Sequence, residues 1–285
     1  MERVFVYGTL RKNERNHHLL KDCKCMAEQA WIYGTLYDTY NNYPTMTLHE
    51  NDKVYGEIYE VSKSQLNQLD LLEDYVPGRK NNLYERVFRK VYTDIGEEEV
   101  FVYICNRPEL LQEEVPYGDW KLYRMLKNPH QTVSYLAYGS CMDDDRFKLA
   151  KVDHYFNKVI GVGVLQGYSM KYLYSAQDGG RADILEDGGE TEGILYELPF
   201  EAISYLFKRE GFYSKCYRPT FVTVKADGKL HEDVLTFHVY EKKEESAPPI
   251  HYATEILRGS KGRVSEGYFK KLQLDLKRLG VEIDI

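Results

Sequence analysis

The sequence predicts an α+β fold made of two tandem copies of one small domain, each with a mixed, barrel-like sheet and flanking helices. Two observations predict it. Several segments of the first half recur in the second half in the same order, and strand-like runs outnumber helical runs in each copy. A few helices among many short strands are typical of an α+β domain with a small, closed or nearly closed sheet. The length of 285 residues suits about two domains of ordinary size.

Four pairs of segments make up the repeat. They share a Tyr-Gly pair followed by a hydroxyl residue, a Gly-x-x-Tyr-Glu strand, a leucine-led segment ending in Glu, and a later tyrosine. The pairs are residues 5–9 and 136–140, 54–60 and 191–197, 69–73 and 206–210, and in part 84–86 and 217–218. Such agreement in order and residue type indicates an internal duplication.

The spacing within the repeat supports the duplication. Glu73 follows Gly56 by 17 residues, and Glu210 follows Gly193 by 17 residues. The Tyr-Gly turn lies 66 residues before the glutamate in the first copy and 72 before it in the second, which a small loop difference explains. With the join near residues 128–130, we expect domains at residues 1–129 and 130–285, the second with a C-terminal helical extension.

The strands are predicted from short apolar or alternating runs. Residues 3–7 and 132–138 are such runs, and each ends in Tyr-Gly followed by a small hydroxyl residue, which is a turn signal. Further strands are predicted at residues 53–61, 83–93 and 98–105 in the first copy, and at 191–198, 216–225 and 232–240 in the second.

A helix is predicted before the glutamate of each copy. Ser62 and Gln65 have the spacing of a capping box, so we expect a helix from there to near Glu73. Pro199 is expected at the start of the corresponding helix in the second copy. The tail from residue 248 onward is predicted to be helical, without a counterpart in the first half. The acidic runs, residues 97–99 and 186–187, are expected in solvated turns.

Charge and composition disfavour several classes of function. The net charge is −7 without a long basic run, which argues against nucleic-acid and membrane-surface partners, because these are bound mainly through Lys and Arg clusters. No apolar run approaches the ~20 residues of a membrane span, and no secretory signal is visible. Five irregularly spaced cysteines favour reduced thiols and a cytoplasmic location. A small polar substrate remains the expected partner.

The recurring motifs carry a resemblance to a known family. Residues 6–11 and 137–140 resemble the Tyr-Gly-Ser/Thr loop of the gamma-glutamylcyclotransferase-like superfamily. Residues 69–75, followed by Tyr84 and Arg86, resemble its Leu-Asp-x-x-Glu-Gly element. Both halves match, so the resemblance covers nearly the whole chain. It implies two tandem gamma-glutamylcyclotransferase-like domains, which we expect to pack on each other.

The two halves resemble different branches of that family. The first is similar to the compact branch, which acts on gamma-glutamylamines and similar small adducts. The second is similar to the longer cyclotransferases, through residues 180–184 and 249–268. Three residues of the second half depart from the family pattern: Asp183 and Cys141 stand where Asn is expected, and Phe207 stands where the first copy has Asp.

The resemblance implies a reaction that needs no metal and no organic cofactor. The alpha-amino group of a gamma-glutamyl unit attacks its own gamma-carbonyl, which releases 5-oxoproline and an amine. Glu73 and Glu210 are the implied general bases and acids, because a carboxylate can take the proton of the amino group and pass it to the leaving amine. Apolar neighbours are expected to raise the pKa of each glutamate, whereas Lys208 and Arg209 would oppose the rise at Glu210.

The Tyr-Gly turns are predicted to hold the gamma-glutamyl substrate. Glycine there allows backbone angles closed to other residues, so successive N–H groups can point at a carboxylate or an oxyanion. Thr9 and Ser140 would add a hydroxyl, and Arg11 a charge to the first site only. The predicted substrate-binding residues are Tyr7, Gly8, Thr9, Leu10, Arg11 and Tyr84 in the first copy, and Tyr138, Gly139, Ser140, Cys141 and Tyr217 in the second.

Other chemistries fit the sequence less well. The histidines and cysteines within residues 17–25 match no standard zinc spacing, and that stretch is predicted to be a surface helix. Cys141 and Cys216 lie near site elements, but no histidine has a comparable place in both halves, and the first copy has Leu10 at the position of Cys141. Two alternatives stay open: a module that binds a small ligand without turnover, and a transferase in which an external amine attacks the gamma-glutamyl carbonyl.

Overall fold

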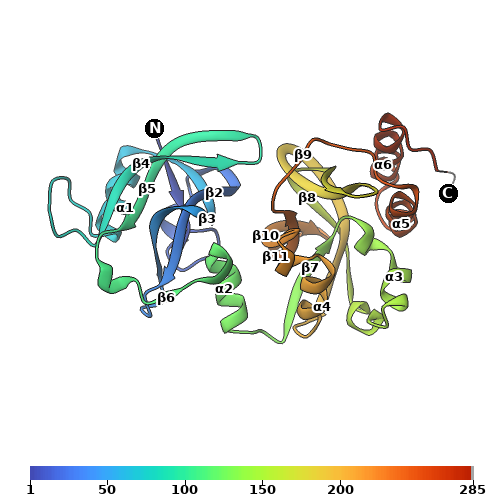
Figure 1. Ribbon diagram of the computed structural model, residues 1–285, viewed down its shortest axis with the longest axis horizontal. Coiled ribbons are helices and arrows are strands. Elements are labelled where there is room, and N and C mark those ends of the chain that lie inside the picture. The colour runs from blue at the N-terminus through green and yellow to red at the C-terminus, as the bar shows by residue number, and fades with distance from the viewer. Residues whose placement is uncertain (284–285) are drawn as a thin grey trace. The chain divides into compact units, whose positions relative to one another are not determined.

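The structure of the chain is a computed structural model that describes residues 1–283 (Figure 1). The chain divides into two compact units, Met1–Asn128 and a second that begins at Pro129. Each unit is built around its own sheet. In the described part of the chain, no helix is both long and apolar enough to cross a membrane.

The first unit is rich in strands. Its strands are β1 (Glu2–Val6), β2 (Lys24–Asp38), β3 (Pro44–Val61), β4 (Tyr84–Thr93), β5 (Gly96–Cys105) and β6 (Glu113–Glu114). Its helices are α1 (Lys63–Leu72) and α2 (Trp120–Lys127), with short 3-10 helices at η1 (His17–Leu19), η2 (Pro108–Leu110) and η3 (Pro116–Gly118). The sheet has the order β3-β1-β5-β4-β2-β6, and an additional pairing of β2 with β3 joins β1 to β5 into a ring.

The second unit is built in the same way. Its strands are β7 (Thr132–Ala137), β8 (Val159–Ala176), β9 (Gly179–Pro199), β10 (Tyr217–Ala226) and β11 (Lys229–Val239). Its helices are α3 (Asp144–Leu149), α4 (Ala202–Arg209), α5 (Ile250–Ser260) and α6 (Glu266–Arg278), with 3-10 helices at η4 (Ser140–Met142), η5 (Asp153–Phe156) and η6 (Phe212–Ser214). The strands close a barrel in the order β10-β11-β7-β9-β8.

The two rings have the same strand order. In each ring, the strand that leads into the Tyr-Gly turn is antiparallel to one neighbour, β3 or β9, and parallel to the other, β5 or β11. The remaining pairings also correspond, because β2 and β4 take the places of β8 and β10. The α+β prediction with two small barrel-like domains is confirmed.

A glycine lets two strands approach closely at the same point of both rings. A Cβ atom on Gly56 would lie 2.2 Å from the carbonyl oxygen of Val6, and one on Gly193 would lie 2.3 Å from that of Ala137. Neither distance is possible for a real side chain. The conserved spacing from glycine to glutamate in the two copies therefore connects a point of close strand contact to the end of the following helix.

Strand β1 places its alternate side chains in two cores, as a β-strand must. Phe5 and Tyr7 lie in the core inside the ring. Val4 and Val6 lie in a second core, which also contains Leu66 and Leu69 of α1 and two buried tyrosines, Tyr84 and Tyr103. The apolar face of α1 is thereby fixed against the sheet, and the C-terminal end of α1 is held close to the end of β1.

Most predicted elements are present with small shifts in their ends. The capping box before α1 is confirmed: the Ser62 hydroxyl accepts a hydrogen bond from the Gln65 N–H at 3.2 Å, and the Gln65 side chain accepts one from the Ser62 N–H at 2.8 Å. The tail forms α5 and α6, as expected. The sequence did not indicate β2, β8 or α2, because their apolar residues lack a regular period.

Three local predictions were wrong. Residues 17–25 form the short η1 and the start of β2 instead of a surface helix. Pro199 is the last residue of β9, and α4 begins three residues later with Glu201 as its N-cap. The acidic runs at 97–99 and 186–187 lie within β5 and β9 instead of turns, because their partner strands satisfy the backbone while the side chains reach solvent.

Candidate active sites

The first unit contains a cavity of about 170 Å³ at the end of β1. It lies where the Tyr-Gly turn, the start of β3, the end of α1 and the start of β4 meet. The predicted residues that line it are Tyr7, Gly8, Thr9, Leu10, Glu73 and Tyr84. The structure therefore brings together residues that are up to 77 positions apart in the sequence.

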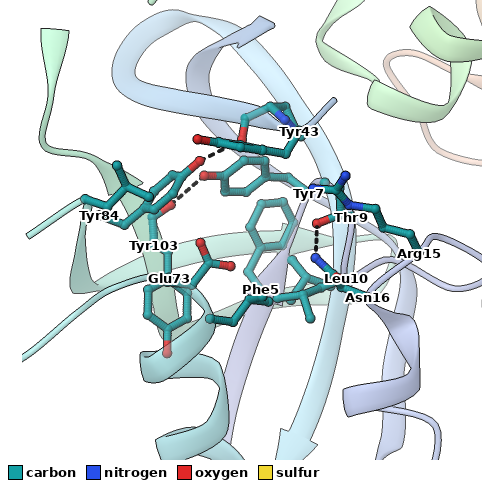
Figure 2. Close-up of a pocket in the computed structure, with 15 residues that line it drawn as sticks. Phe5, Tyr7, Thr9, Leu10, Arg15, Asn16, Tyr43, Glu73, Tyr84 and Tyr103 are labelled. Atoms are coloured by element: carbon teal, nitrogen blue, oxygen red, sulfur yellow. Dashed lines mark hydrogen bonds between the residues drawn. The ribbon is translucent and has the colours of Figure 1, made fainter. Parts of the chain in front are cut away.

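Glu73 is held at the cavity by the end of α1. It is the C-cap residue, its N–H donates to the carbonyl of Leu69 at 2.9 Å, and the next residue, Asp74, has a left-handed backbone with φ of 50°. Figure 2 shows its carboxylate pointing into the cavity and facing the tyrosine side chains. Burial raises the pKa of Glu73 to about 8. Within residues 1–283, no side chain forms a hydrogen bond or ion pair with this carboxylate.

The tyrosines of the first cavity direct their hydroxyl hydrogens at the backbone. The Tyr7 hydroxyl donates to the carbonyl of Tyr103 at 2.8 Å, and the Tyr84 hydroxyl donates to that of Pro44 at 3.0 Å (Figure 2). Burial and the nearby Glu73 raise the pKa of both phenols, so they stay protonated. Because each hydrogen is committed, the phenol oxygens can act only as acceptors toward a ligand.

The turn after β1 is closed by a bond from the Arg11 N–H to the carbonyl of Gly8 at 3.0 Å. This bond leaves the N–H groups of the two central residues, Thr9 and Leu10, unused by the turn itself. Gly8 does not have the left-handed backbone that we expected of it. It is required for space instead, because a Cβ atom would lie 2.6 Å from Cγ of Pro44.

Arg11 does not line the cavity. It is buried and pairs with Glu57 of β3 at 3.1 Å and with Asp119 before α2 at 3.0 Å, which raises its pKa further. Glu57 also accepts from the Lys12 N–H at 2.8 Å, and Asp119 caps α2 through the Leu122 N–H. The arrangement fastens the turn to two elements of the domain, so the role that we expected for Arg11 in substrate binding is replaced here by positioning.

The second unit has an equivalent cavity of about 300 Å³, with a small adjoining recess of about 30 Å³. Together they are lined by all the predicted residues of the second copy: Tyr138, Gly139, Ser140, Cys141, Glu210 and Tyr217. The Tyr138 hydroxyl donates to the carbonyl of Phe237, and the Tyr217 hydroxyl to that of Ala182, each at 2.7 Å. The tyrosine arrangement of the first cavity is thus repeated.

The turn of the second cavity also matches the first. The Met142 N–H donates to the carbonyl of Gly139 at 3.0 Å, which leaves the N–H groups of Ser140 and Cys141 unused by the turn. Gly139 has φ of −117°, so its backbone is not left-handed either. A Cβ atom there would lie 3.3 Å from that of Ala182, and crowding is again the physical constraint.

Glu210 differs from Glu73 in having close partners. It too is a helix C-cap, with its N–H on the carbonyl of Leu206 at 2.8 Å and a left-handed residue, Gly211, after it. Its Oε1 atom accepts a hydrogen bond from the Cys141 thiol at 3.2 Å and lies 3.8 Å from Nε of Arg209. Burial raises the pKa of Glu210, while Arg209 and the Cys141 hydrogen bond oppose the rise, as the sequence led us to expect for Arg209.

Asp183, which departs from the family pattern, lies outside the lining of both cavities. It is fully buried, accepts from the Val239 N–H at 3.0 Å and pairs with Lys242. Its carboxylate therefore fixes the end of β11 to β9. The zinc alternative gains nothing from the structure, because no group of three or more His, Cys, Asp and Glu side chains in residues 1–283 is arranged to hold a metal ion.

Several lining residues were not predicted from the sequence. The most informative are Tyr43 and Tyr103 in the first cavity, and Arg181, Arg209 and Tyr252 in the second. Tyr103 lies on a predicted strand, but nothing in its spacing singled it out. Tyr252 belongs to the tail that resembles the longer cyclotransferases, and this resemblance could have suggested it.

The paired barrels, each with a glutamate at a helix end beside a Tyr-Gly turn, define a class of protein that the comparisons name. The chain belongs to the gamma-glutamyl cyclotransferase, AIG2-like family. The model of that family matches residues 4–122, and the model of the AIG2-like family matches residues 190–272.

Particular relatives cover the whole chain or its first half. YkqA of Bacillus subtilis, provisionally named a gamma-glutamylcyclotransferase, is 42% identical over 97% of this chain and 98% of its own length. The crystal structure of YkqA matches with a TM-score of 0.89 over 99% of both chains. The gamma-L-glutamyl-butirosin B gamma-glutamyl cyclotransferase of Niallia circulans is 42% identical over 44% of this chain and 79% of its own.

Proposed function

We propose that the chain is a cofactor-independent gamma-glutamylcyclotransferase that releases 5-oxoproline and an amine from a small gamma-glutamyl substrate, with one site in each domain, residues 1–129 and 130–285. The observation that carries the proposal is the Glu73 carboxylate. It faces a tyrosine-lined cavity, has no cation beside it, and has a pKa of about 8. A carboxylate with such a pKa is a much better base near neutral pH than an ordinary glutamate.

The reaction follows from proton transfers at one carboxylate. Glu73 takes a proton from the substrate's alpha-ammonium group, and the freed lone pair forms a bond to the gamma-carbonyl carbon. The bond from that carbon to the leaving nitrogen then breaks, and Glu73 returns the proton to this nitrogen. Because the amine and the carbonyl belong to one molecule, holding them in the attack geometry supplies much of the acceleration; comparable intramolecular reactions reach effective molarities of about 10⁵ M or more.

The polar groups of the cavity match the ends of a gamma-glutamyl unit. The phenol oxygens of Tyr7 and Tyr84 can only accept, so together with Glu73 they suit the alpha-amino group. The unused N–H groups of Thr9 and Leu10 suit an anion, either the alpha-carboxylate or the oxyanion that forms at the gamma-carbon. The printed name of the Niallia circulans relative, which matches the first half, supports a gamma-glutamylated amine as the substrate there.

The test is to follow 5-oxoproline by mass spectrometry with a panel of gamma-glutamyl amines, amino acids and lysine side-chain adducts. The unmodified chain would be compared with Glu73→Gln, Glu210→Gln and the double variant. We expect each single variant to abolish release from a different part of the panel. Release that survives in the double variant would remove both glutamates from the mechanism.

A second function is favoured for the second domain by one observation. The Cys141 thiol and Arg209 already occupy the surroundings of Glu210, which suits a site that binds a gamma-glutamyl ligand without turnover. Thermal stabilisation by such ligands without 5-oxoproline, in the Glu73→Gln chain, would support binding alone. Product masses containing an added amine would instead indicate transfer to an external acceptor.

A further inference from the structure

The two cavities differ in charge at a position before a shared carbonyl group. In each domain, a tyrosine hydroxyl from β4 or β10 donates to one carbonyl group, that of Pro44 in the first domain and of Ala182 in the second. The residues that precede these carbonyls, Tyr43 and Arg181, are therefore equivalent, and both line their cavities. The second cavity has a guanidinium group where the first has a phenol.

The same exchange occurs beside the catalytic glutamates. Leu72 precedes Glu73, Arg209 precedes Glu210, and both Leu72 and Arg209 line their cavities. Two uncharged side chains of the first cavity are thus replaced by guanidinium groups in the second. The second cavity is also the larger, at about 300 Å³ against about 170 Å³.

Arg209 lies in the second cavity with mostly neutral partners. Its Nε donates to the Cys141 thiol at 3.0 Å and its Nη2 to the Ser140 hydroxyl at 3.1 Å, while Oε1 of Glu210 is 3.8 Å away. Its side chain is only 15% exposed. A cation taken out of water is stabilised by a nearby anion, so this site favours a negatively charged ligand group.

Arg181 is oriented by its surroundings and still has donors to spare. Its guanidinium group lies over the ring of Tyr252, 4.9 Å from the centroid, and its Nη2 pairs with Asp178 at 2.7 Å. Asp178 is on the solvent side, with about half of its side chain exposed. Arg146, at the rim of the same cavity, pairs with Glu255. A planar guanidinium group offers five N–H donors, so these pairs leave some free for a carboxylate.

We propose that the second cavity selects gamma-glutamyl peptides whose released amino acid is itself acidic, such as gamma-glutamyl-glutamate, through Arg181 and Arg209. This inference rests on the proposed function for its reaction but concerns only the charge of the leaving group. The first cavity, with Tyr43 and Leu72 at these positions, has no such groups and does not prefer an acidic leaving group. One chain would then act on gamma-glutamyl compounds of two charge classes.

The experiment compares gamma-glutamyl-glutamate with its neutral isostere gamma-glutamyl-glutamine in the Glu73→Gln chain, where only the second site can turn over. We expect kcat/KM for 5-oxoproline release to favour the acidic peptide by about tenfold or more, because a carboxylate on a guanidinium forms a strong, charge-assisted pair. The preference should fall as salt is raised, since salt screens charge pairs that solvent can reach.

Substitution at Arg181 tests the assignment to this cavity. Arg181→Gln is expected to reduce the ratio of the two kcat/KM values to about twofold or less, by the loss of that charge-assisted pair. The matched control is Arg278→Gln, which breaks an ion pair with Glu245 outside the cavity and should leave the ratio unchanged. Equal turnover of both peptides, or a ratio that Arg181→Gln leaves intact, would overturn the inference.

Calorimetric binding separates this inference from the proposed reaction. If the Glu73→Gln chain releases no 5-oxoproline from either peptide, the second site is not a cyclotransferase, and binding of the two peptides decides the question of charge. Tighter binding of gamma-glutamyl-glutamate that Arg181→Gln removes supports the inference even then. Equal binding of the two peptides contradicts it.

Discussion

The thiol of Cys141 donates a hydrogen bond to Oε1 of Glu210 at 3.2 Å, whereas the equivalent position beside Glu73 is occupied by the apolar Leu10. Burial also raises the pKa of the Cys141 thiol to about 11, so it remains a protonated donor at neutral pH. The two glutamates therefore share a position in the fold but not an electrostatic environment. Glu73 keeps its raised pKa without opposition, and Glu210 does not.

The first prediction concerns the pH dependence of the first site. In the Glu210→Gln chain, kcat/KM should rise as pH increases through about 8, because Glu73 must lose its proton to act as a base. Glu73→Gln should lower kcat by about 10² to 10⁴. The measurement is 5-oxoproline release between pH 6 and pH 10. A profile that is flat across this range would exclude Glu73 as the titrating base.

The second prediction concerns the contribution of Glu73 to stability. Its folded-state pKa of about 8 lies above the usual 4.5, so the stability it gives is fully present below pH 4.5 and is lost as pH rises through about 8. Glu73→Gln should therefore raise the unfolding free energy at pH 9 relative to pH 4.5, by on the order of 2 kcal/mol after allowing for solvent screening.

The control for this measurement is Glu97→Gln. Glu97 pairs with Lys90 at an exposed position, so its removal should not produce that pH dependence. Urea unfolding of both variants at the two pH values compares them. If both variants respond alike to pH, the Glu73 carboxylate does not have a raised pKa in the folded protein.

The third prediction concerns the hydrogen bond from Cys141. The thiol lowers the pKa of Glu210, so Cys141→Ala should raise that pKa and shift the pH profile of the second site upward. The profile is measured in the Glu73→Gln chain with a peptide substrate. Cys216→Ala is a suitable comparison, because Cys216 lines the same cavity but bonds to the Tyr174 hydroxyl instead of Glu210. Equal profiles in both variants would contradict the role of Cys141.

The fourth prediction concerns the buried ion pairs that fasten the first turn. Arg11→Met leaves the carboxylates of Glu57 and Asp119 without their cation, and we expect a loss of about 3–5 kcal/mol in unfolding free energy. Arg3→Met removes a half-exposed pair with Glu98 on the same domain and should cost less than about 1 kcal/mol. Chemical denaturation measures both. Similar costs would mean that the Arg11 pairs do not hold the turn.

The fifth prediction concerns the glycines at the close strand contact. Gly56→Ala and Gly193→Ala each place a methyl group against a backbone oxygen that the ring holds in place, and should destabilise their domain by about 2 kcal/mol or more. Gly267→Ala in α6 is the control, because a Cβ atom there meets nothing closer than 3.9 Å. Its helix should be unchanged or slightly stabilised, and thermal unfolding distinguishes the three variants.

The sequence predicted the local features of both sites well, because these depend on neighbours along the chain. The capping box at Ser62 fixes where α1 begins, and the constant spacing from glycine to glutamate fixes where it ends. The tyrosines that line the cavities were found because they recur. The glutamates were found for the same reason, although neither would be distinctive in a single copy.

The sequence by itself therefore determined the duplication, the strand-rich α+β class and the two glutamates, since periodicity, caps and spacing are encoded locally. Only the tertiary structure decided which side chains meet. It turned Arg11 inward onto Glu57 and Asp119, placed Arg181 beside Tyr252, and gave Gly8 a reason of space instead of backbone angle. Each of these depends on contacts between segments far apart in the chain, which the closing of each sheet into a ring creates.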